Sequence, residues 1–111
     1  MKGALVLLLF SPVFALAQNP NVLEQGREVF NKSCSSGYCH GAAGAGGGAP
    51  RIAARGFDQN FITNTVTRGI ANTGMQAFAN ALSREELNAV VAYVARLNGI
   101  SNPSTPPVAS A

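Results

Sequence analysis

The sequence predicts a small all-α domain of three to four short helices, preceded by a leader that is removed. Three observations lead to this prediction. Apolar residues recur at three- and four-residue intervals in three separate stretches, as they do on one face of a helix. No stretch alternates apolar and polar residues as a half-buried strand would. Glycine-rich and proline-containing segments separate the three stretches and act as loops.

The first element is the leader, residues 1–17. It has a positive start at Lys2, an apolar run over residues 4–10 and the small-x-small ending Ala15-Leu16-Ala17. These are the three parts of a secretory signal peptide, with cleavage predicted before Gln18. The apolar run is too short for a comfortable membrane span, although retention as an uncleaved anchor is the alternative. We therefore expect a protein exported to the periplasm or beyond, with no membrane span after processing.

The rest divides into a domain, residues 18–100, and a Ser/Pro/Ala-rich tail, residues 101–111, expected to be disordered. A domain of this size is stabilised only weakly by its own core, so a disulfide, a metal or a buried cofactor is expected to help. The formal net charge is +3, and the charged residues are scattered singly. This pattern argues against nucleic-acid binding, which needs a clustered basic face.

The first helix is predicted over about residues 22–33. Asn21 followed by Glu24 resembles a capping arrangement at its start. Gly26 lies inside the predicted helix, where glycine costs about 0.5–1 kcal/mol relative to alanine, so a partner backbone is expected to approach it closely. The apolar face consists of Val22, Val29 and Phe30.

Two further helices follow a glycine-rich loop at residues 41–48. The second helix is expected to stop near Gly69, and its apolar positions are Phe57, Phe61, Ile62, Val66 and Ile70. The third helix begins with a capping box formed by Ser83 and Glu86 and ends before Gly99. Its apolar positions are Leu87, Val90, Tyr93, Val94 and Leu97.

The candidate site is the segment from Cys34 to His40, in which Cys39 directly precedes the histidine. The familiar haem-attachment signature has two residues between its cysteines, whereas four lie between these. In an exported protein the two cysteines could instead form a disulfide. A zinc site lacks a fourth soft ligand, because the chain has only two Cys and one His. The motif alone leaves haem attachment and a disulfide open.

The stretch from about residue 21 to residue 99 resembles a class I monohaem cytochrome c of the short bacterial type. The likeness is carried by the following residues: Gly26 and Phe30, Cys39-His40-Gly41, Ala49-Pro50-Arg51-Ile52, Arg68-Gly69, Gly74-Met75-Gln76-Ala77-Phe78, and Tyr93. The resemblance implies a cytochrome c-like domain wrapped around one covalent haem c. It makes Cys34 and Cys39 the thioether anchors, His40 the proximal ligand of the iron and Met75 the distal ligand.

The resemblance also implies a role for residues around the ligands. The carbonyl of Pro50 would accept the hydrogen bond of the ligand imidazole, and the first and last helices would cross at Gly26, Phe30 and Tyr93. The chain departs from the family in its longer attachment loop and in Gln76, which stands where proline usually follows the methionine. The second departure is expected to loosen the loop that presents the sulfur.

Other positions are candidates for haem contacts. Ile52 and Phe78 are expected to pack on the haem, although either suits an ordinary core. Arg55 and Arg68 are expected to bond haem propionates, because guanidinium matches a carboxylate with two parallel hydrogen bonds. The alternative for each arginine is a solvated surface side chain. For Met75 the alternative is a residue that fills a gap in the core.

The predicted function is that of a monomeric carrier of single electrons between redox proteins, a donor dehydrogenase and an acceptor oxidase or reductase. No nucleophile–base set is visible in the sequence, so we do not expect an enzyme. Lys32 is the one lysine left after processing, which predicts docking with weak salt dependence. The alternatives are a haem-based ligand sensor or peroxidase-like protein, and a haemless secreted binding module with a Cys34–Cys39 disulfide.

Overall fold

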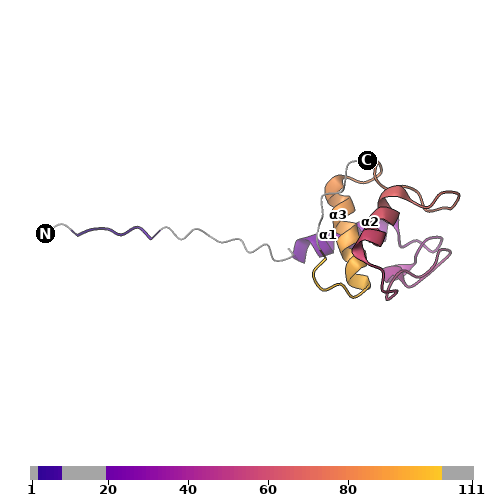
Figure 1. Ribbon diagram of the computed structural model, residues 1–111, viewed down its shortest axis with the longest axis horizontal. Coiled ribbons are helices and arrows are strands. Elements are labelled where there is room, and N and C mark those ends of the chain that lie inside the picture. Colours follow the sequence, from indigo (N-terminus) through magenta and orange to yellow (C-terminus); the bar gives the residue numbers. More distant parts are fainter. Residues whose placement is uncertain (1–2, 9–19, 104–111) are drawn as a thin grey trace.

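The computed structural model describes residues 3–8 and 20–103. Its elements are the helices α1 (Pro20–Ser33), α2 (Gln59–Arg68) and α3 (Arg84–Leu97) and the short 3-10 helix η1 (Ala42–Gly44). No strand occurs in these two ranges (Figure 1). The all-α prediction is confirmed.

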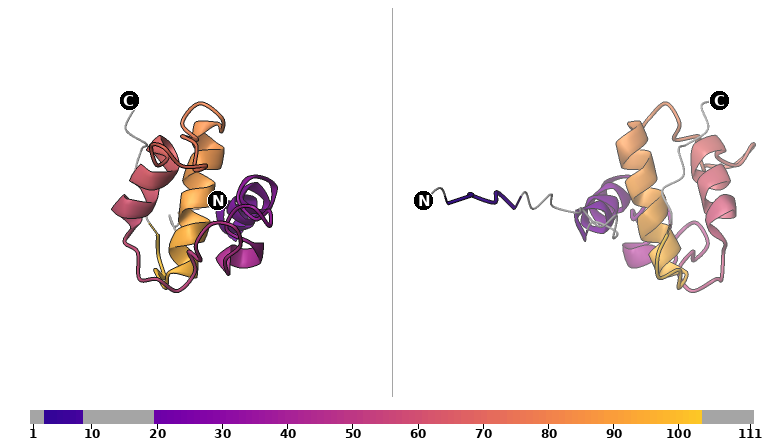
Figure 2. Two further views of the ribbon diagram at one scale, coloured as in Figure 1. Left: turned by 90° about the vertical axis from the view of Figure 1, so that its right-hand side faces the viewer. Right: turned by 60° about the vertical axis from the view of Figure 1, so that its left-hand side comes forward.

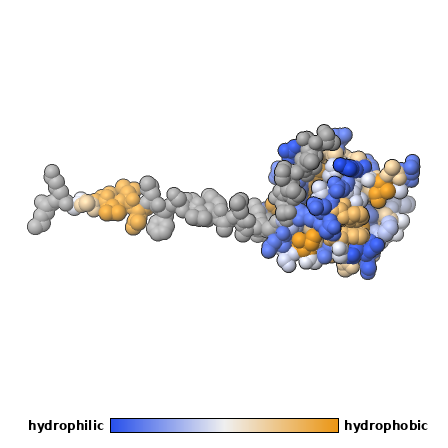
Figure 3. All heavy atoms as spheres, viewed as in Figure 1, coloured by the Kyte–Doolittle hydropathy of each residue, from blue (hydrophilic) through white to orange (hydrophobic). Residues whose placement is uncertain are grey.

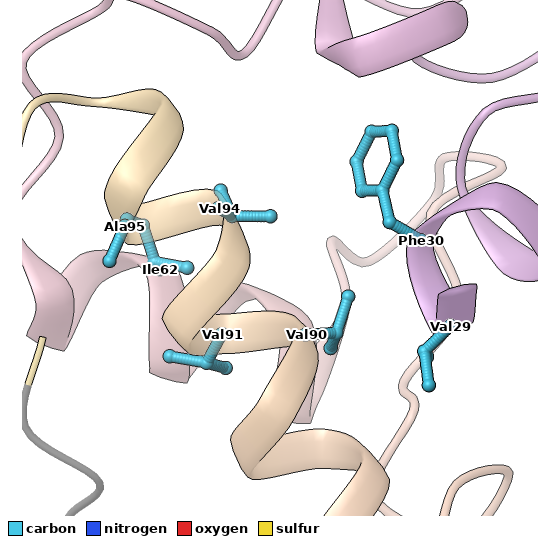
Figure 4. Close-up of a cluster of buried hydrophobic side chains, with 7 residues drawn as sticks. All are labelled: Val29, Phe30, Ile62, Val90, Val91, Val94 and Ala95. Atoms are coloured by element: carbon cyan, nitrogen blue, oxygen red, sulfur yellow. The ribbon is translucent and has the colours of Figure 1, made fainter. Parts of the chain in front are cut away.

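The core forms where α3 packs between the two other long helices (Figures 1 and 2). The third helix contributes most of the buried side chains because small and β-branched residues recur around much of its circumference. The first helix adds an aromatic ring and a valine, and the second adds an isoleucine (Figure 4). The cluster consists of Val29, Phe30, Ile62, Val90, Val91, Val94 and Ala95.

The crossing of α1 and α3 is built around Gly26, which is buried. A Cβ atom at this position would overlap the carbonyl of Ala89 and lie 2.8 Å from the Cβ of Tyr93. One turn further along α1, the ring of Phe30 lies 5.4 Å from the ring of Tyr93, with the planes tilted by 53°. This is a favourable geometry for an aromatic pair. The close approach predicted at Gly26 is confirmed, since only glycine lets the two helices come this near.

Capping contacts define the ends of α2 and the start of α3. The side chain of Asp58, which was not predicted as a cap, accepts a hydrogen bond from the Phe61 N–H (2.8 Å) at the start of α2, and Gly69 ends that helix with φ of 65°. Ser83 and Glu86 form the predicted capping box at the start of α3, which ends at Leu97, before Gly99. The two predicted helix ends and the capping box are therefore confirmed.

The start of α1 differs from the prediction. The helix begins at Pro20, so Asn21 lies inside it and is not its cap. Proline suits the first turn of a helix, because its φ is already near the helical value and its missing N–H has no partner there. Glu24 forms an ion pair with Arg27 on the helix surface. The proposed Asn21 and Glu24 cap was wrong.

The two ends of the chain are only partly described. Residues 3–8 of the leader form no helix and expose an apolar stretch, including Leu5 and Leu8 (Figure 3). The predicted cleavage point before Gln18 and residues 104–111 of the predicted tail lie outside the described ranges. Residues 101–103 belong to the packed body, because Pro103 is buried and Arg96 bonds the Ser101 carbonyl (2.9 Å). In residues 3–8 and 20–103 no helix is long and apolar enough to cross a bilayer.

Candidate functional site

The candidate site begins where α1 ends. The carbonyl of Phe30 accepts hydrogen bonds from the N–H groups of Cys34 (2.8 Å) and Ser35 (3.1 Å). The Ser35 hydroxyl also bonds the Asn31 carbonyl (2.8 Å). These contacts close the last turn and satisfy carbonyls that would otherwise lack partners. Cys34 is thereby fixed at the helix end, half-buried against the core.

The four residues between the cysteines form a closed turn. The Cys39 N–H bonds the Ser36 carbonyl (2.9 Å), and the His40 N–H reaches back to the Cys34 carbonyl (2.9 Å). The spacer is therefore folded out of the helical path, and the backbones of Cys34 and His40 meet at its base. Tyr38, at the outer end of this turn, is 93% exposed. The lengthened spacer thus forms a bulge at the end of α1.

Both cysteines carry free thiols, so the disulfide that the motif left open is not formed. Burial raises the pKa of the Cys34 thiol to about 11, with a smaller contribution from the charge of Cys39. At neutral pH Cys34 is accordingly a protonated, uncharged thiol.

His40 follows the second cysteine and is half-buried. Its Nδ1 lies 2.8 Å from the carbonyl oxygen of Pro50. A neutral imidazole that donates its Nδ1–H to this carbonyl keeps the lone pair of Nε2 available for a metal. The contact expected between His40 and Pro50 is present, and it fixes the orientation of the ring.

Met75, the second candidate ligand, lies in the loop between α2 and α3 and is half-buried. Its N–H bonds the Thr73 hydroxyl (3.1 Å), which in turn donates to the Ile70 carbonyl (2.7 Å). Its carbonyl accepts from the Ile70 N–H (3.0 Å). A Cβ at Gly69 would lie 2.5 Å from that carbonyl, so the end of α2 packs directly on the loop. These backbone contacts support the loop at Met75, where Gln76 follows in place of the usual proline.

The two loops that carry the candidate ligands lie on the same side of the helical body in Figure 1. The attachment loop follows α1, and the Met75 loop follows α2. Because separate helices hold the two loops, each is supported independently of the other.

The four candidate haem-contact residues fall into two groups. Ile52 is half-buried against the core cluster, and Phe78 is 6% exposed, so both have an apolar environment. The guanidinium of Arg55 stacks over the Phe57 ring at 5.1 Å and donates to the Arg51 carbonyl (3.0 Å). Arg68 is exposed at the end of α2. The structure thus gives Arg55 partners within the protein, whereas it gives no such anchor for Arg68 among the described residues.

Sequence reasoning missed the part played by Asn98, the C-cap of α3. Its Oδ1 accepts from the N–H groups of Arg55 (2.9 Å) and Phe57 (3.3 Å), and its Nδ2 donates to the carbonyls of Ile52 (3.0 Å) and Val94 (3.0 Å). One amide thus fixes the segment that follows Pro50 to the end of α3. Its place directly after the last apolar position of the helix was the available signal.

Thr67, on the last turn of α2, was also missed. Within the described ranges its Oγ1 is the one buried side-chain polar atom without a hydrogen-bond partner. The adjacent backbone of α2 supports the chain that follows Met75, because the carbonyls of Val66 and Thr67 accept from Phe78 (3.0 Å) and Ala79 (3.3 Å). A buried hydroxyl without a partner costs free energy, so it is suited to receive a bound group. Nothing in the sequence pattern marked this position.

Comparison with known proteins identifies one family and several similar structures. The family described as "Cytochrome C oxidase, cbb3-type, subunit III" matches residues 21–94. The c-type cytochrome NirC superimposes with a TM-score of 0.57 and 27% identity, over 77% of this chain and 99% of that one. No protein with a curated description matches the chain significantly.

Two more distant structures share the fold. Cytochrome CL of the marine methylotroph Methylophaga aminisulfidivorans MPT has a TM-score of 0.55 and 20% identity, over 75% of this chain and 62% of that one. The dihydro-heme d1 dehydrogenase NirN, in complex with DHE, has a TM-score of 0.57 and 24% identity over 71% of this chain. The chain spans only 16% of the NirN length, so this likeness concerns one part of a larger protein.

Proposed function

Since the chain belongs to the cytochrome c family described as cbb3-type cytochrome c oxidase subunit III, we propose that it is an exported carrier of single electrons. The family and the c-type cytochrome fold imply covalently bound haem c. Covalent attachment needs thiols, and the chain has two cysteines, both in the attachment loop. Cys34 and Cys39 are therefore the proposed thioether anchors.

The observation that carries the proposal is the contact between His40 Nδ1 and the Pro50 carbonyl (2.8 Å) at the base of a turn with two free thiols. It occupies Nδ1 and leaves the remaining ring nitrogen available as the proposed metal ligand. The residues present therefore fit a covalent haem, with His40 as proximal ligand. The buried Thr67 hydroxyl, which has no hydrogen-bond partner, is also consistent with a group that binds to the protein.

Met75 is the proposed distal ligand. When bound, the haem supplies an iron that exchanges one electron between its ferric and ferrous states. Methionine ligation raises the reduction potential relative to two imidazoles, and a filled sixth position favours electron transfer over reaction with small ligands. The Thr73 and Ile70 contacts hold the backbone of Met75 in its loop, which supports this role.

Carbon monoxide binding tests this assignment. We expect the reduced protein to bind carbon monoxide slowly at neutral pH, and Met75→Ala to bind it rapidly and to have a lower reduction potential. Gln76→Ala, which truncates the exposed neighbouring side chain, is the matched control and should behave as wild type. Rapid binding by the wild type would instead favour the ligand sensor or peroxidase-like protein.

The proposed partners are redox proteins, with a dehydrogenase as donor and an oxidase or reductase as acceptor. The family description names an oxidase subunit, which supports an oxidase as the acceptor. Because charged residues are sparse and scattered, docking should depend weakly on ionic strength. A steep fall of the electron-transfer rate with added salt would contradict this expectation.

Export is proposed from the leader, residues 1–17. The three parts of a signal peptide support it, and thioether attachment with periplasmic electron transfer is consistent with an exported domain. N-terminal sequencing of the protein isolated from the periplasm should read from Gln18. A sequence that starts at the initiating methionine would favour the uncleaved anchor.

A further inference from the structure

The turn between Cys34 and Cys39 is held by the glycine-rich loop that follows His40. The Gly48 N–H bonds the Gly37 carbonyl (2.9 Å), and the Ala49 N–H bonds the Cys39 carbonyl (3.1 Å). The Gly46 N–H bonds the His40 carbonyl (2.7 Å). Three backbone carbonyls of the spacer and motif are thus bonded to one short stretch of backbone.

The contact is too close for any other residue type at two positions. A Cβ at Gly47 would lie 2.6 Å from the Cys39 carbonyl oxygen and 2.9 Å from that of Gly37. A Cβ at Gly48 would lie 2.8 Å from the Tyr38 carbonyl oxygen. Neither glycine has a positive φ, so the requirement is one of space and not of backbone conformation.

Side chains do little to order the spacer, because Ser36, Gly37 and Tyr38 are all exposed. Fixing a backbone costs conformational entropy, so a spacer with exposed side chains needs backbone contacts to adopt one form. Ser35 is held by the end of α1, and the contact with the glycine-rich loop is the one that holds the far part of the spacer, at Gly37.

We propose that Gly47 and Gly48 are positioning residues that hold the long spacer in the form in which both cysteines attach to one haem. The inference rests on the proposed function. In the attachment itself, each thiol adds across one vinyl double bond: sulfur bonds one carbon, the thiol hydrogen goes to the other, and nothing is oxidised or released. A spacer that departs from this form places one thiol out of reach of its vinyl group.

The test compares Gly47→Ala and Gly48→Ala with Gly37→Ala, all expressed with a cytochrome c maturation system. Gly37 lies in the same spacer but has nothing within 4 Å of a built Cβ, so it is the matched control. The readout is the number of thioethers per chain, from mass spectrometry after alkylation of free thiols. A remaining vinyl group also moves the α band of the pyridine haemochrome to longer wavelength. We expect Gly47→Ala and Gly48→Ala to lower the doubly attached fraction several-fold and Gly37→Ala to leave it unchanged.

Removal of Ser36 and Gly37 provides the second variant, because it restores the two-residue spacer and so leaves no long spacer for residues 47 and 48 to hold. In this shortened chain Gly47→Ala should recover double attachment. If Gly47→Ala is as doubly attached as wild type, or stays defective in the shortened chain, the inference is wrong. A wild-type chain with no covalent haem would contradict the proposed function itself.

Discussion

The helix crossing and the two ligand loops are held together by different forces. At the crossing of α1 and α3, buried apolar side chains meet around Gly26, and the two backbones nearly touch. In the attachment loop and the Met75 loop, backbone hydrogen bonds and glycine contacts replace side-chain burial, and many residues are exposed.

This difference separates stability from function in the molecule. Changes at the crossing should lower the free energy of unfolding, whereas changes in the loops should alter haem attachment and ligation. Asn98 joins the end of α3 to the segment behind Pro50 and so connects the two regions. The expected loss of unfolding free energy is largest at the crossing and smallest at the surface.

The largest expected effect is at Phe30, which is fully buried. Phe30→Ala removes the aromatic contact with Tyr93 and leaves a cavity, which should cost about 3–5 kcal/mol of unfolding free energy. Urea titration followed by circular dichroism measures it. Tyr38→Ala, at an aromatic residue that is 93% exposed, is the control and should stay within about 0.5 kcal/mol of wild type. Equal losses of unfolding free energy in both variants would mean that the crossing does not stabilise the protein more than the loop does.

Gly26→Ala tests the close backbone approach. Its methyl group would overlap the Ala89 carbonyl, so the helices must separate, at a cost of about 1–3 kcal/mol. Thermal unfolding measures the loss. Gly74→Ala, where nothing lies within 4 Å of a built Cβ, should leave the melting temperature nearly unchanged. A Gly26→Ala protein as stable as wild type would mean that the helices do not cross as described.

Asn98→Ala should cost about 1–2 kcal/mol, because four backbone groups lose a partner at a half-buried site. The loss of these bonds should free residues 52–57 and thereby make the position of the Pro50 carbonyl less fixed. Hydrogen exchange of the Arg55 and Phe57 amides should accelerate. Unchanged exchange at both amides would rule out this link between the regions.

The smallest effect is expected at the start of α3. Ser83→Ala removes the cap of the helix and should cost about 1 kcal/mol at pH 7.

Hydrogen bonds from the Ser83 backbone and hydroxyl lower the pKa of the Glu86 carboxyl. Its stabilising contribution is therefore present above the pKa of the unfolded chain and is lost as the pH falls through the lowered value. Glu86→Gln should flatten the acid side of the stability curve, and an unchanged slope below pH 5 would contradict the capping box.

Much of the fold followed from local patterns, because periodicity and caps act within a few residues. The end of α2 at Gly69, the start of α3 at Ser83 and the close approach at Gly26 were predictable in this way. The start of α1 was not, since Pro20 and Asn21 both carry helix-start signals and only the structure decides between them. The Gly47 and Gly48 contacts and the bonds from Asn98 to residues 52–57 join segments that are separate in sequence, which no local pattern encodes.

The residue types of the candidate site could be read from the sequence, but their arrangement in space could not. Cys34, Cys39, His40 and Pro50 stood out by residue type, and the structure adds the hydrogen bond that aligns His40 with Pro50. It also adds the support of the Met75 N–H by the Thr73 hydroxyl, two residues earlier in the chain.

The most direct test of the account is the mass of one tryptic peptide. Trypsin cleaves after Lys32 and Arg51, so residues 33–51 carry both cysteines and His40. The protein is extracted with acid–acetone, alkylated and digested. We expect the colour to stay with this peptide, which should be heavier by one haem and carry no alkylated thiol. A colourless peptide with two alkylated cysteines, or one lighter by two hydrogens, would contradict it.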